Sequence, residues 1–447
     1  MQKRISYSFF PTLFVWALLF TSCGSRRALT DQYYQQLIQQ QKSAEVVTTK
    51  PETTQLPVEQ IQPPSDARQN VSLIARRDRG TWLGELQYAL DSLCNIPLFE
   101  TTQLGLYVYD LTDDIPLYAL NSNQRMRPAS CQKLVTSISA LNFLGPDYRF
   151  STEVFTTGNI VDGVLQGDLY VVGGMDPLLS TDDLRQLADS LRAMGLKNIR
   201  GRLYRDVSRK DDLELGMGWC WDDDYGPLTA LSVDGKDQFS NVWPGLLRAA
   251  GIMCNGTCVD KQRPASAVSL RAIQHSMDDV LIPMMKESDN IYAESMFYQL
   301  AFLSGQKGAG RKQAISYIEK LISSLGLNPE LYQIADGSGL SLYNYVSPLM
   351  LSTLLIYAYR TEAIRNHLYP SLPIAGVDGT LSKRMLDTPA FQRIHAKTGT
   401  VNGISSLCGY AEAGNGHLLV FSIINQGVVR SDQGKDFQDQ VCILLCR

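Results

Sequence analysis

The stretch Pro128-Ala129-Ser130-Cys131-Gln132-Lys133 decides the fold. In the residues that follow it, apolar side chains recur at helical spacing, at Leu134, Ile138 and Leu141. We therefore expect a buried helix that begins at about Ser130, with Lys133 on the same face because it lies three residues on. A deprotonated lysine within hydrogen-bond reach of a serine can act as the base that activates the serine for attack on a carbonyl.

Two further short motifs follow in the chain. Ser288-Asp289-Asn290 lies where a helix is expected to begin, and Lys397-Thr398-Gly399-Thr400 follows a run, Phe391–Ala396, that looks like a strand. A second Ser-x-x-Lys, Ser304-Gly305-Gln306-Lys307, lies in a Gly-rich loop between two helical stretches, and we interpret it as a chance match. Only the Ser130 motif is followed by the other two motifs in a fixed order.

The order Ser-x-x-Lys, Ser-x-Asn, Lys-Thr-Gly resembles the penicillin-recognising serine acyl-transferases, which include penicillin-binding proteins and serine β-lactamases. The resemblance implies that Ser130 attacks the bond between two D-alanines and forms an acyl-enzyme, while neutral Lys133 accepts its proton. It further implies a proton relay through Ser288. Residues for binding the substrate are implied by motif match: Asn290, Lys397, Thr398, Gly399 and Thr400. Backbone N–H groups of Ser130 and Thr400 would form the oxyanion hole.

The separation of Ser130 from Ser288 is much longer than in a compact serine β-lactamase. This spacing resembles the D-Ala-D-Ala carboxypeptidase/endopeptidase family, low-molecular-mass penicillin-binding proteins with a domain inserted between the first two motifs. Local matches extend the resemblance over about residues 80–447; they are Gly167–Leu169, Gly173–Pro177, Asp336–Ser341 and Gly376–Leu381. The implied fold is α/β (α+β), an antiparallel sheet flanked by helices with a smaller mixed α/β insertion.

The residues predict the same organisation along the chain. Strands are expected at 104–109, 117–120, 152–156, 168–172, 199–204, 403–411 and 417–424, and helices at 82–93, 181–194, 277–304, 313–325 and 348–360, with a closing helix near the end. We expect the peptidase domain at 79–154 and 266–447 and the inserted domain at 155–265. The Asp336-Gly337-Ser338-Gly339 stretch fits either a simple turn or, as we prefer, a loop that lines the site.

The N-terminus reads as an export signal over residues 1–23, with Lys3 and Arg4 before a short apolar run. Small residues directly before Cys23 resemble a bacterial lipoprotein signal, in which the cysteine becomes the lipidated first residue; a plain secretory signal is the alternative. Residues 24–78 are rich in Gln, Thr and Pro and predict a flexible linker. We therefore expect an exported, periplasmic protein held to a membrane by a lipid.

Composition excludes some classes of function. With 447 residues, a net charge of -4 and 44% hydrophobic residues, the chain is neither disordered nor a basic nucleic-acid-binding protein.

Export permits disulfides, and Cys254 with Cys258 could close a short turn. The resemblance implies that the first and last helices pack together, which would bring Cys94 near Cys442 or Cys446 for a bridge. Scattered histidines argue against zinc, and we expect neither a metal ion nor a cofactor.

Two residues have open interpretations. Asp206 falls where the family places an acidic residue that meets the amino group of a diaminopimelate side chain; an exposed surface carboxylate is the alternative. Cys131 points about 100° away from Ser130 on a helix, which favours a place in the core.

We expect a serine DD-peptidase that acts on peptidoglycan stem peptides and is inhibited by β-lactam antibiotics. A serine β-lactamase and a non-catalytic β-lactam- or wall-binding protein are the alternatives. The sequence leaves open carboxypeptidase against endopeptidase action, since both cleave after a D-alanine. Turnover of a muropeptide would separate an enzyme from a binding protein.

Overall fold

The computed structural model describes residues 74, 78–221, 223 and 226–447. The predicted signal, Cys23 and nearly all of the predicted linker lie outside these residues. Within the described part, no helix is long and apolar enough to cross a bilayer.

The first structural unit is a five-stranded sheet in the order β12-β13-β14-β1-β2, antiparallel throughout. Its strands are β1 (Gln103–Asp110), β2 (Ile115–Leu120), β12 (Ile394–Val401), β13 (Gly403–Glu412) and β14 (Leu418–Val428). The inner strands are buried on both faces, which explains why they read as nearly continuous apolar runs. The predicted antiparallel sheet flanked by helices is confirmed.

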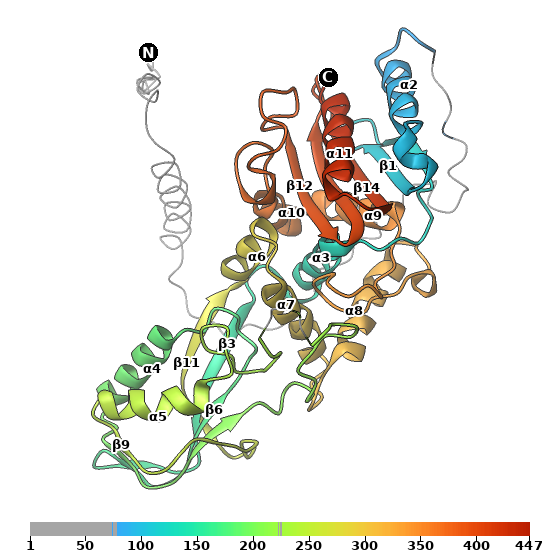
Figure 1. Ribbon diagram of the computed structural model, residues 1–447. Coiled ribbons are helices and arrows are strands. Elements are labelled where there is room, and N and C mark those ends of the chain that lie inside the picture. The colour runs from blue at the N-terminus through green and yellow to red at the C-terminus, as the bar shows by residue number, and fades with distance from the viewer. Residues whose placement is uncertain (1–73, 75–77, 222, 224–225) are drawn as a thin grey trace, which may run out of the picture. The chain divides into compact units, whose positions relative to one another are not determined.

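Helices cover both faces of this sheet. The first and last helices, α2 (Trp82–Cys94) and α11 (Ser431–Leu445), pack against each other, and α11 lies across β13 and β14 (Figure 1). Thr81 caps α2 by accepting a hydrogen bond from the Gly84 amide at 3.1 Å. On the other face α9 (Pro348–Arg360) packs against β1, β13 and β14.

A helical layer stands beside the sheet. It contains α3 (Gln132–Leu144), α6 (Met277–Lys286), α7 (Asn290–Phe302), α8 (Arg311–Ser324) and α10 (Glu362–Ser371). Helix α3 is buried on every side from Gln132 to Asn142, and α7 is buried over nearly its whole length. Because they are buried on nearly every side, α3 and α7 are the central helices of this layer. These two helices carry the candidate site.

The segment between α3 and α6 forms a second unit with its own apolar core. Its main sheet has the order β10-β8-β6-β3-β11 and a small sheet has the order β4-β5-β7-β9. The strands are β3 (Arg149–Thr156), β4 (Ile160–Val161), β5 (Val164–Leu165), β6 (Leu169–Val172), β7 (Asn198–Ile199), β8 (Leu203–Asp206), β9 (Met253–Cys254), β10 (Val259–Asp260) and β11 (Val268–Ser276). Helices α4 (Thr181–Ala193) and α5 (Phe239–Ala249) pack together on it (Figure 1).

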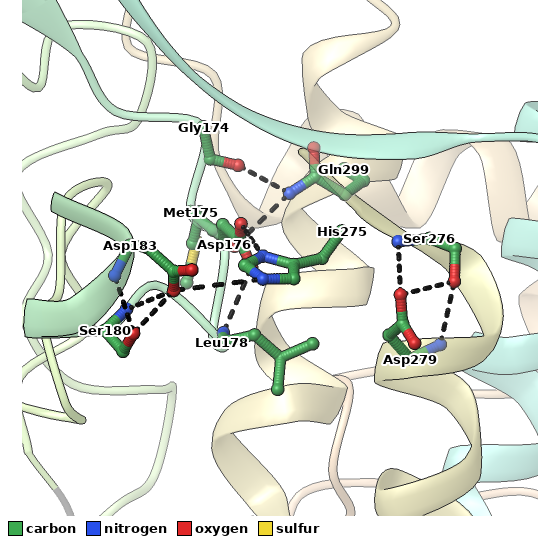
Figure 2. A network of polar contacts seen from close by, with 10 residues as sticks. All are labelled: Gly174, Met175, Asp176, Leu178, Ser180, Asp183, His275, Ser276, Asp279 and Gln299. Atoms are coloured by element: carbon green, nitrogen blue, oxygen red, sulfur yellow. Dashed lines mark hydrogen bonds and ion pairs between the residues drawn. The ribbon is translucent and has the colours of Figure 1, made fainter. Parts of the chain in front are cut away.

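Polar contacts join this second unit to the helical layer (Figure 2). Inside the second unit, His275 at the end of β11 pairs through Nδ1 with the buried Asp176 carboxylate at 2.6 Å. Gln299 of α7 donates to the Gly174 carbonyl at 2.8 Å. The hydroxyl of Ser276 then caps α6 by accepting the Asp279 amide at 3.2 Å, so the chain leaves β11 and enters the helical layer without a linker.

Several predicted elements have other bounds. The predicted strand 199–204 is two strands, β7 and β8, in different sheets, because Gly201 turns the chain between them. The predicted helix 277–304 is α6 and α7, separated at Ser288, where φ is 63°. Helix α3 begins at Gln132, because Ala129–Cys131 form a tighter 3₁₀ turn. The strand predicted at 391–396 begins later, at Ile394, and contains the Lys-Thr-Gly motif. Helices α5 and α10 were not predicted.

The predicted disulfides are absent from the described part of the chain. All eight cysteines described there are free thiols; they are Cys94, Cys131, Cys220, Cys254, Cys258, Cys408, Cys442 and Cys446. Helices α2 and α11 do pack side by side, as expected. The Cys94 thiol nevertheless hydrogen-bonds to Tyr118 of β2, while the Cys254 thiol donates to the Pro244 carbonyl at 3.8 Å. Shared packing therefore does not bring these sulfurs into bonding positions.

Candidate active site

Ser130 lies in a tight turn that two other segments hold in place. The preceding residue, Ala129, has φ of 47°, a left-handed conformation that costs an L-residue about 1 kcal/mol or more. A Cβ on Gly339 would lie 1.9 Å from the Ala129 carbonyl oxygen, and a Cβ on Gly399 would lie 2.6 Å from the Pro128 carbonyl oxygen. Both neighbours must be glycine for the backbones to approach so closely, and their packing fixes the turn.

Lys133 lies directly behind the Ser130 hydroxyl and is fully buried. Its Nζ lies 3.0 Å from Ser130 Oγ, 2.6 Å from Asn290 Oδ1 and 2.9 Å from the Ser338 carbonyl oxygen. Burial, followed by the nearby charge of Lys397, lowers the pKa of Lys133 to about 7. A large fraction of Lys133 is therefore neutral at neutral pH, within the distance needed to take a proton from Ser130.

Lys397 provides a second buried ammonium on strand β12. Its Nζ donates to Ser288 Oγ at 2.8 Å and to the Thr398 carbonyl at 3.0 Å. Burial lowers the pKa of Lys397 to about 8, against an opposing contribution from Cys131. The structure thus brings the Ser-x-x-Lys, Ser-x-Asn and Lys-Thr-Gly motifs together around two lysines.

The break between α6 and α7 places Ser288 and Asn290. Ser288 adopts a left-handed backbone conformation after α6 ends, which turns the chain before α7 begins. Asp289 caps α7 by accepting the Tyr292 amide at 3.1 Å. Asn290 is the first residue of α7, and its side chain meets Lys133. The local sequence therefore directs Ser288 to one lysine and Asn290 to the other.

The end of β12 borders the Ser130 turn. Thr398 Oγ1 donates to Thr380 Oγ1 at 2.7 Å, and Thr400 is exposed at the end of the strand. Gly399 between them approaches the Cys131 amide, where a Cβ would be only 3.0 Å away. Hydroxyls and backbone amides at this strand end can bind an anionic group next to Ser130.

Sequence reasoning missed one member of the site, Glu294. It is fully buried on α7, and its Oε1 accepts the backbone amides of Gly337 and Ser338 at 3.0 and 2.8 Å. Burial, followed by the nearby Asp336, raises the pKa of Glu294 to about 8. A signal was present in the sequence, because Glu294 lies four residues after Asn290 and hence on the same helix face.

The Asp336–Gly339 stretch is a loop that lines the site, as predicted, and is not only a turn. The Asp336 carboxylate accepts four hydrogen bonds of 2.7 to 2.9 Å, from Trp219 Nε1, the Gly339 and Ser341 amides and Asn344 Nδ2. Trp219 comes from the second unit, so that unit supports the loop directly. The loop in turn presents the Ser338 carbonyl to Lys133.

The other predicted residues lie as follows. Asp206 is buried rather than exposed, and its two oxygens accept the amides of Ser208 at 3.0 Å and Arg263 at 2.8 Å. Cys131 is fully buried, in agreement with a core position. Ser304 follows α7 in a turn and donates to the Ala301 carbonyl at 2.7 Å, so the second Ser-x-x-Lys motif forms no comparable pair.

One group of side chains in the described residues has metal-ligand spacing: Asp110, Asp113 and His417. His417 Nδ1 lies 2.7 Å from Asp110 Oδ2, and Asp110 Oδ1 accepts the amides of Thr112 and Asp113. These contacts stabilise the turn between β1 and β2. Asp110 and His417 thus take part in the structure of this turn, which lies outside the three motifs.

Comparison with known proteins agrees with this geometry. The model of the D-Ala-D-Ala carboxypeptidase 3 (S13) family matches residues 86–235 and 227–447. D-alanyl-D-alanine carboxypeptidase DacB of Haemophilus influenzae is 26% identical over 434 residues, which are 76% of this chain and 90% of that relative. D-alanyl-D-alanine carboxypeptidase of Actinomadura sp. strain R39 is 28% identical over 78% of this chain and 82% of that relative.

A solved structure has the same fold. The crystal structure of penicillin binding protein 4 (dacB) from Haemophilus influenzae superposes with a TM-score of 0.71 at 24% identity and covers 79% of this chain and 97% of that one. The same protein complexed with a β-lactam gives a TM-score of 0.69. Because the family model spans almost the whole described region, this chain belongs to the D-Ala-D-Ala carboxypeptidase 3 (S13) family.

Proposed function

We propose that the protein is a serine-type D-Ala-D-Ala carboxypeptidase that acts on peptidoglycan stem peptides through an acyl-enzyme on Ser130. The observation that carries the proposal is the 3.0 Å contact between Ser130 Oγ and a buried Lys133 whose pKa is lowered to about 7, in a chain of the S13 family. A nucleophile with a base in reach is the minimum that acyl transfer requires.

Acylation begins when Ser130 Oγ attacks the carbonyl carbon of the penultimate D-alanine and its proton passes to Lys133. The C–N bond to the terminal D-alanine then breaks, and the leaving amine takes a proton through Ser288. Ser288 is suited to this relay because Lys397 holds its hydroxyl at 2.8 Å. Water next attacks the ester: its hydroxyl bonds to the acyl carbon, its other proton passes to Ser130 Oγ as the ester bond breaks, and the shortened peptide is released.

The substrate is bound by groups from the other two motifs. The ammonium of Lys397 and the hydroxyls of Thr398 and Thr400 suit the terminal carboxylate of the peptide. The amide of Asn290 can hydrogen-bond the peptide backbone while its oxygen accepts from Lys133. Gly399 lets the strand end approach the Ser130 turn. Asp206 remains a candidate for binding the amino group of a diaminopimelate side chain, because its two oxygens each accept one backbone amide and keep further acceptor capacity.

The oxyanion that forms in the tetrahedral intermediate is stabilised by the backbone N–H groups of Ser130 and Thr400. Both residues lie on rigid supports, the first in a 3₁₀ turn held between two glycines and the second at the end of β12. A donor of this kind contributes roughly 2.7–4 kcal/mol to transition-state stabilisation.

The cellular setting is part of the proposal. The apolar N-terminal stretch before Cys23 supports export to the periplasm, and Cys23 supports attachment through a lipid. Residues 79–154 and 266–447 then make the penicillin-binding peptidase domain, with residues 155–265 inserted in it. Endopeptidase cleavage of cross-links uses the same bond after a D-alanine, so the two activities belong to one site.

The test combines labelled penicillin with a defined pentapeptide substrate. Ser130→Ala should abolish both covalent labelling and release of D-alanine, because the variant lacks the hydroxyl that forms the ester. Ser304→Ala, the matched change in the other Ser-x-x-Lys motif, should leave both at the wild-type level. Label recovered on a Ser304 peptide, or D-alanine release by Ser130→Ala, would overturn the assignment.

A further inference from the structure

A buried lysine–carboxylate pair lies outside the three motifs. Lys286 Nζ, at the end of α6, is 2.9 and 2.7 Å from the two carboxylate oxygens of Asp378 and 2.5 Å from the Leu372 carbonyl oxygen. Asp378 Oδ1 also accepts the Ile374 amide at 2.9 Å. Lys286 is 4% exposed and Asp378 is 8% exposed, so this pair is almost completely removed from water.

Each partner is two residues away from a hydroxyl group that contacts strand β12. Lys286 is followed by Glu287 and then by Ser288, whose φ of 63° must be held by its surroundings. Asp378 is followed by Gly379 and then by Thr380, which meets the Thr398 hydroxyl at 2.7 Å. A rigid position for the ion pair therefore sets the positions of Ser288 and Thr380.

The two segments also touch through their backbones. Gly379 has φ of 53°, and a Cβ there would lie 2.7 Å from the Lys286 carbonyl oxygen. No other residue type fits this contact without moving α6 away from the loop. Contact at the backbone and contact at the side chains thus hold the same two segments together.

The hydroxyls of Ser288 and Thr380 contact neighbouring residues of one strand, β12. Ser288 Oγ accepts from Lys397, and Thr380 Oγ1 accepts from Thr398. These contacts form a closed loop. Strand β12 contacts Ser288, Ser288 follows the end of α6, the ion pair joins α6 to the Asp378 segment, and Thr380 of that segment contacts β12 again. A closed path of short contacts permits only one spacing between the Ser288 turn and the strand that carries Lys397.

Energetics favour a geometric role for the pair. Removing two charges from water costs several kcal/mol per ion, and well-packed apolar replacements are often as stable or more stable. A buried ion pair is thus poor evidence for stability but can fix a unique arrangement. Misplacement of a reacting group by about 1 Å can reduce a rate roughly 100-fold, so one arrangement matters next to Ser288.

We propose that Lys286 and Asp378 are positioning residues, a buried clamp that holds the proton-relay serine and the carboxylate-binding end of β12 at the spacing that acylation requires. This inference rests on the proposed function, because it concerns the same site. Neither residue touches the substrate in this account. Their effect passes through Ser288 on one side and through Thr380 on the other.

The experiment compares Lys286→Met with the double variant Lys286→Met/Asp378→Leu in penicillin acylation and thermal unfolding. The single variant leaves a buried carboxylate without its cation, so both stability and the acylation rate should fall. The double variant removes both charges and should regain most of the lost melting temperature. Its acylation rate should remain roughly 10- to 100-fold below wild type, because the clamp is still missing. Apparent affinity for penicillin before acylation should change less than the rate.

Asp278→Asn is the matched control. It breaks the pair between Asp278 at the other end of the same helix and His367 of α10, where the Asp278 oxygen and His367 Nδ1 are 2.8 Å apart. This variant should lose stability while keeping the wild-type acylation rate. Recovery of acylation together with stability in the double variant, or a slow Asp278→Asn enzyme, would overturn the clamp. Failure of the wild-type protein itself to form an adduct would instead contradict the proposed function.

Discussion

At the scale of single residues, the site depends on two lysines whose charges are both costly. Each is fully buried, and their pKa values are lowered to about 7 for Lys133 and about 8 for Lys397. Between these values Lys133 is mostly neutral while Lys397 is mostly charged. One lysine can then accept a proton while the other binds a carboxylate and orients Ser288.

This difference predicts the pH dependence of acylation. The rate should rise as pH increases through about 7, when Lys133 loses its proton, and fall above about 8, when Lys397 loses its charge. Stopped-flow acylation by a chromogenic β-lactam from pH 5 to pH 10 would measure the profile. Unfolding measured at the same pH values serves as the control. A rate that stays constant from pH 5 to pH 7 would contradict the role of Lys133 as the base.

The residues of the site were largely predictable, because their chemistry is local in sequence. Ser130 and Lys133 are three residues apart on one helical surface, and the other motifs are equally short. Glu294 and the Ser338 carbonyl were harder to predict. Their roles depend on a hydrogen-bonded loop that packs against α7, and no sequence pattern states which loop a buried carboxylate will meet.

At the scale of elements, long periodic helices were predicted well and breaks were not. Helix α9 has the predicted bounds because a capping Ser347 and Pro348 mark its start. A helix start was expected at Ser288–Asn290, but the apolar pattern continues on both sides of it and predicted one helix over 277–304. The left-handed backbone of Ser288 and its contact with Lys397 show where the two helices separate. The prediction of a disulfide between Cys94 and Cys442 or Cys446 was also wrong. The packing of two helices determines which helices meet but not which side chains face each other.

The junction at His275 gives an element-scale prediction. Its hydrogen bond with Asp176 raises the pKa of His275, and the carboxylates of Asp183 and Asp279 act in the same direction. A raised pKa in the folded state stabilises the fold below the unfolded value of about 6.5, and this stabilisation is lost as pH rises through the folded pKa. His275→Gln should therefore lower the melting temperature more at pH 5.5 than at pH 8.5.

His395 provides the contrasting control. Burial lowers the pKa of His395 to about 4, so the folded state disfavours protonation of this side chain. Because the unfolded chain takes up the proton from about pH 6.5 downward, His395 lowers the stability of the fold as pH falls below that value. His395→Gln should therefore improve relative stability at acid pH, the opposite sign to His275→Gln. Melting curves of both variants across this range would test the assignment. It would be contradicted if the change in melting temperature relative to wild type depended on pH in the same way for both variants.

At the scale of the whole molecule, the inserted unit contributes to the site through Trp219, which bonds Asp336 behind the nucleophile at 2.9 Å. The sequence indicated an insertion from the spacing of two motifs. It did not indicate that Trp219 of the insertion would support the Asp336–Gly339 stretch, because this contact joins positions far apart in the chain.

Membrane attachment is the whole-molecule prediction for the N-terminal region. With Cys23 lipidated, Cys23→Ser should move the protein from the membrane fraction to the soluble periplasmic fraction, because a Gln-, Thr- and Pro-rich linker has no amphipathic face of its own. Fractionation after osmotic shock measures this. Membrane association that is unchanged in Cys23→Ser would return the segment to an ordinary secretory signal.

The fate of bound penicillin tests the central claim most directly. Ser130 should open the β-lactam ring and keep the product as an ester, since a β-lactam resembles a D-Ala-D-Ala terminus. Rapid release would need a base that activates water against this ester. Glu294, a buried carboxylate close enough to act on the charge of Lys133, instead accepts hydrogen bonds from the Gly337 and Ser338 amides.

The measurement is intact-protein mass spectrometry after stoichiometric penicillin is mixed with the purified protein lacking residues 1–23. A DD-peptidase should show a single adduct within seconds that persists for many minutes, while D-alanine release from a pentapeptide stays blocked for the same time. Steady hydrolysis of penicillin with many turnovers per second, and no lasting adduct, would contradict this account and indicate a β-lactamase.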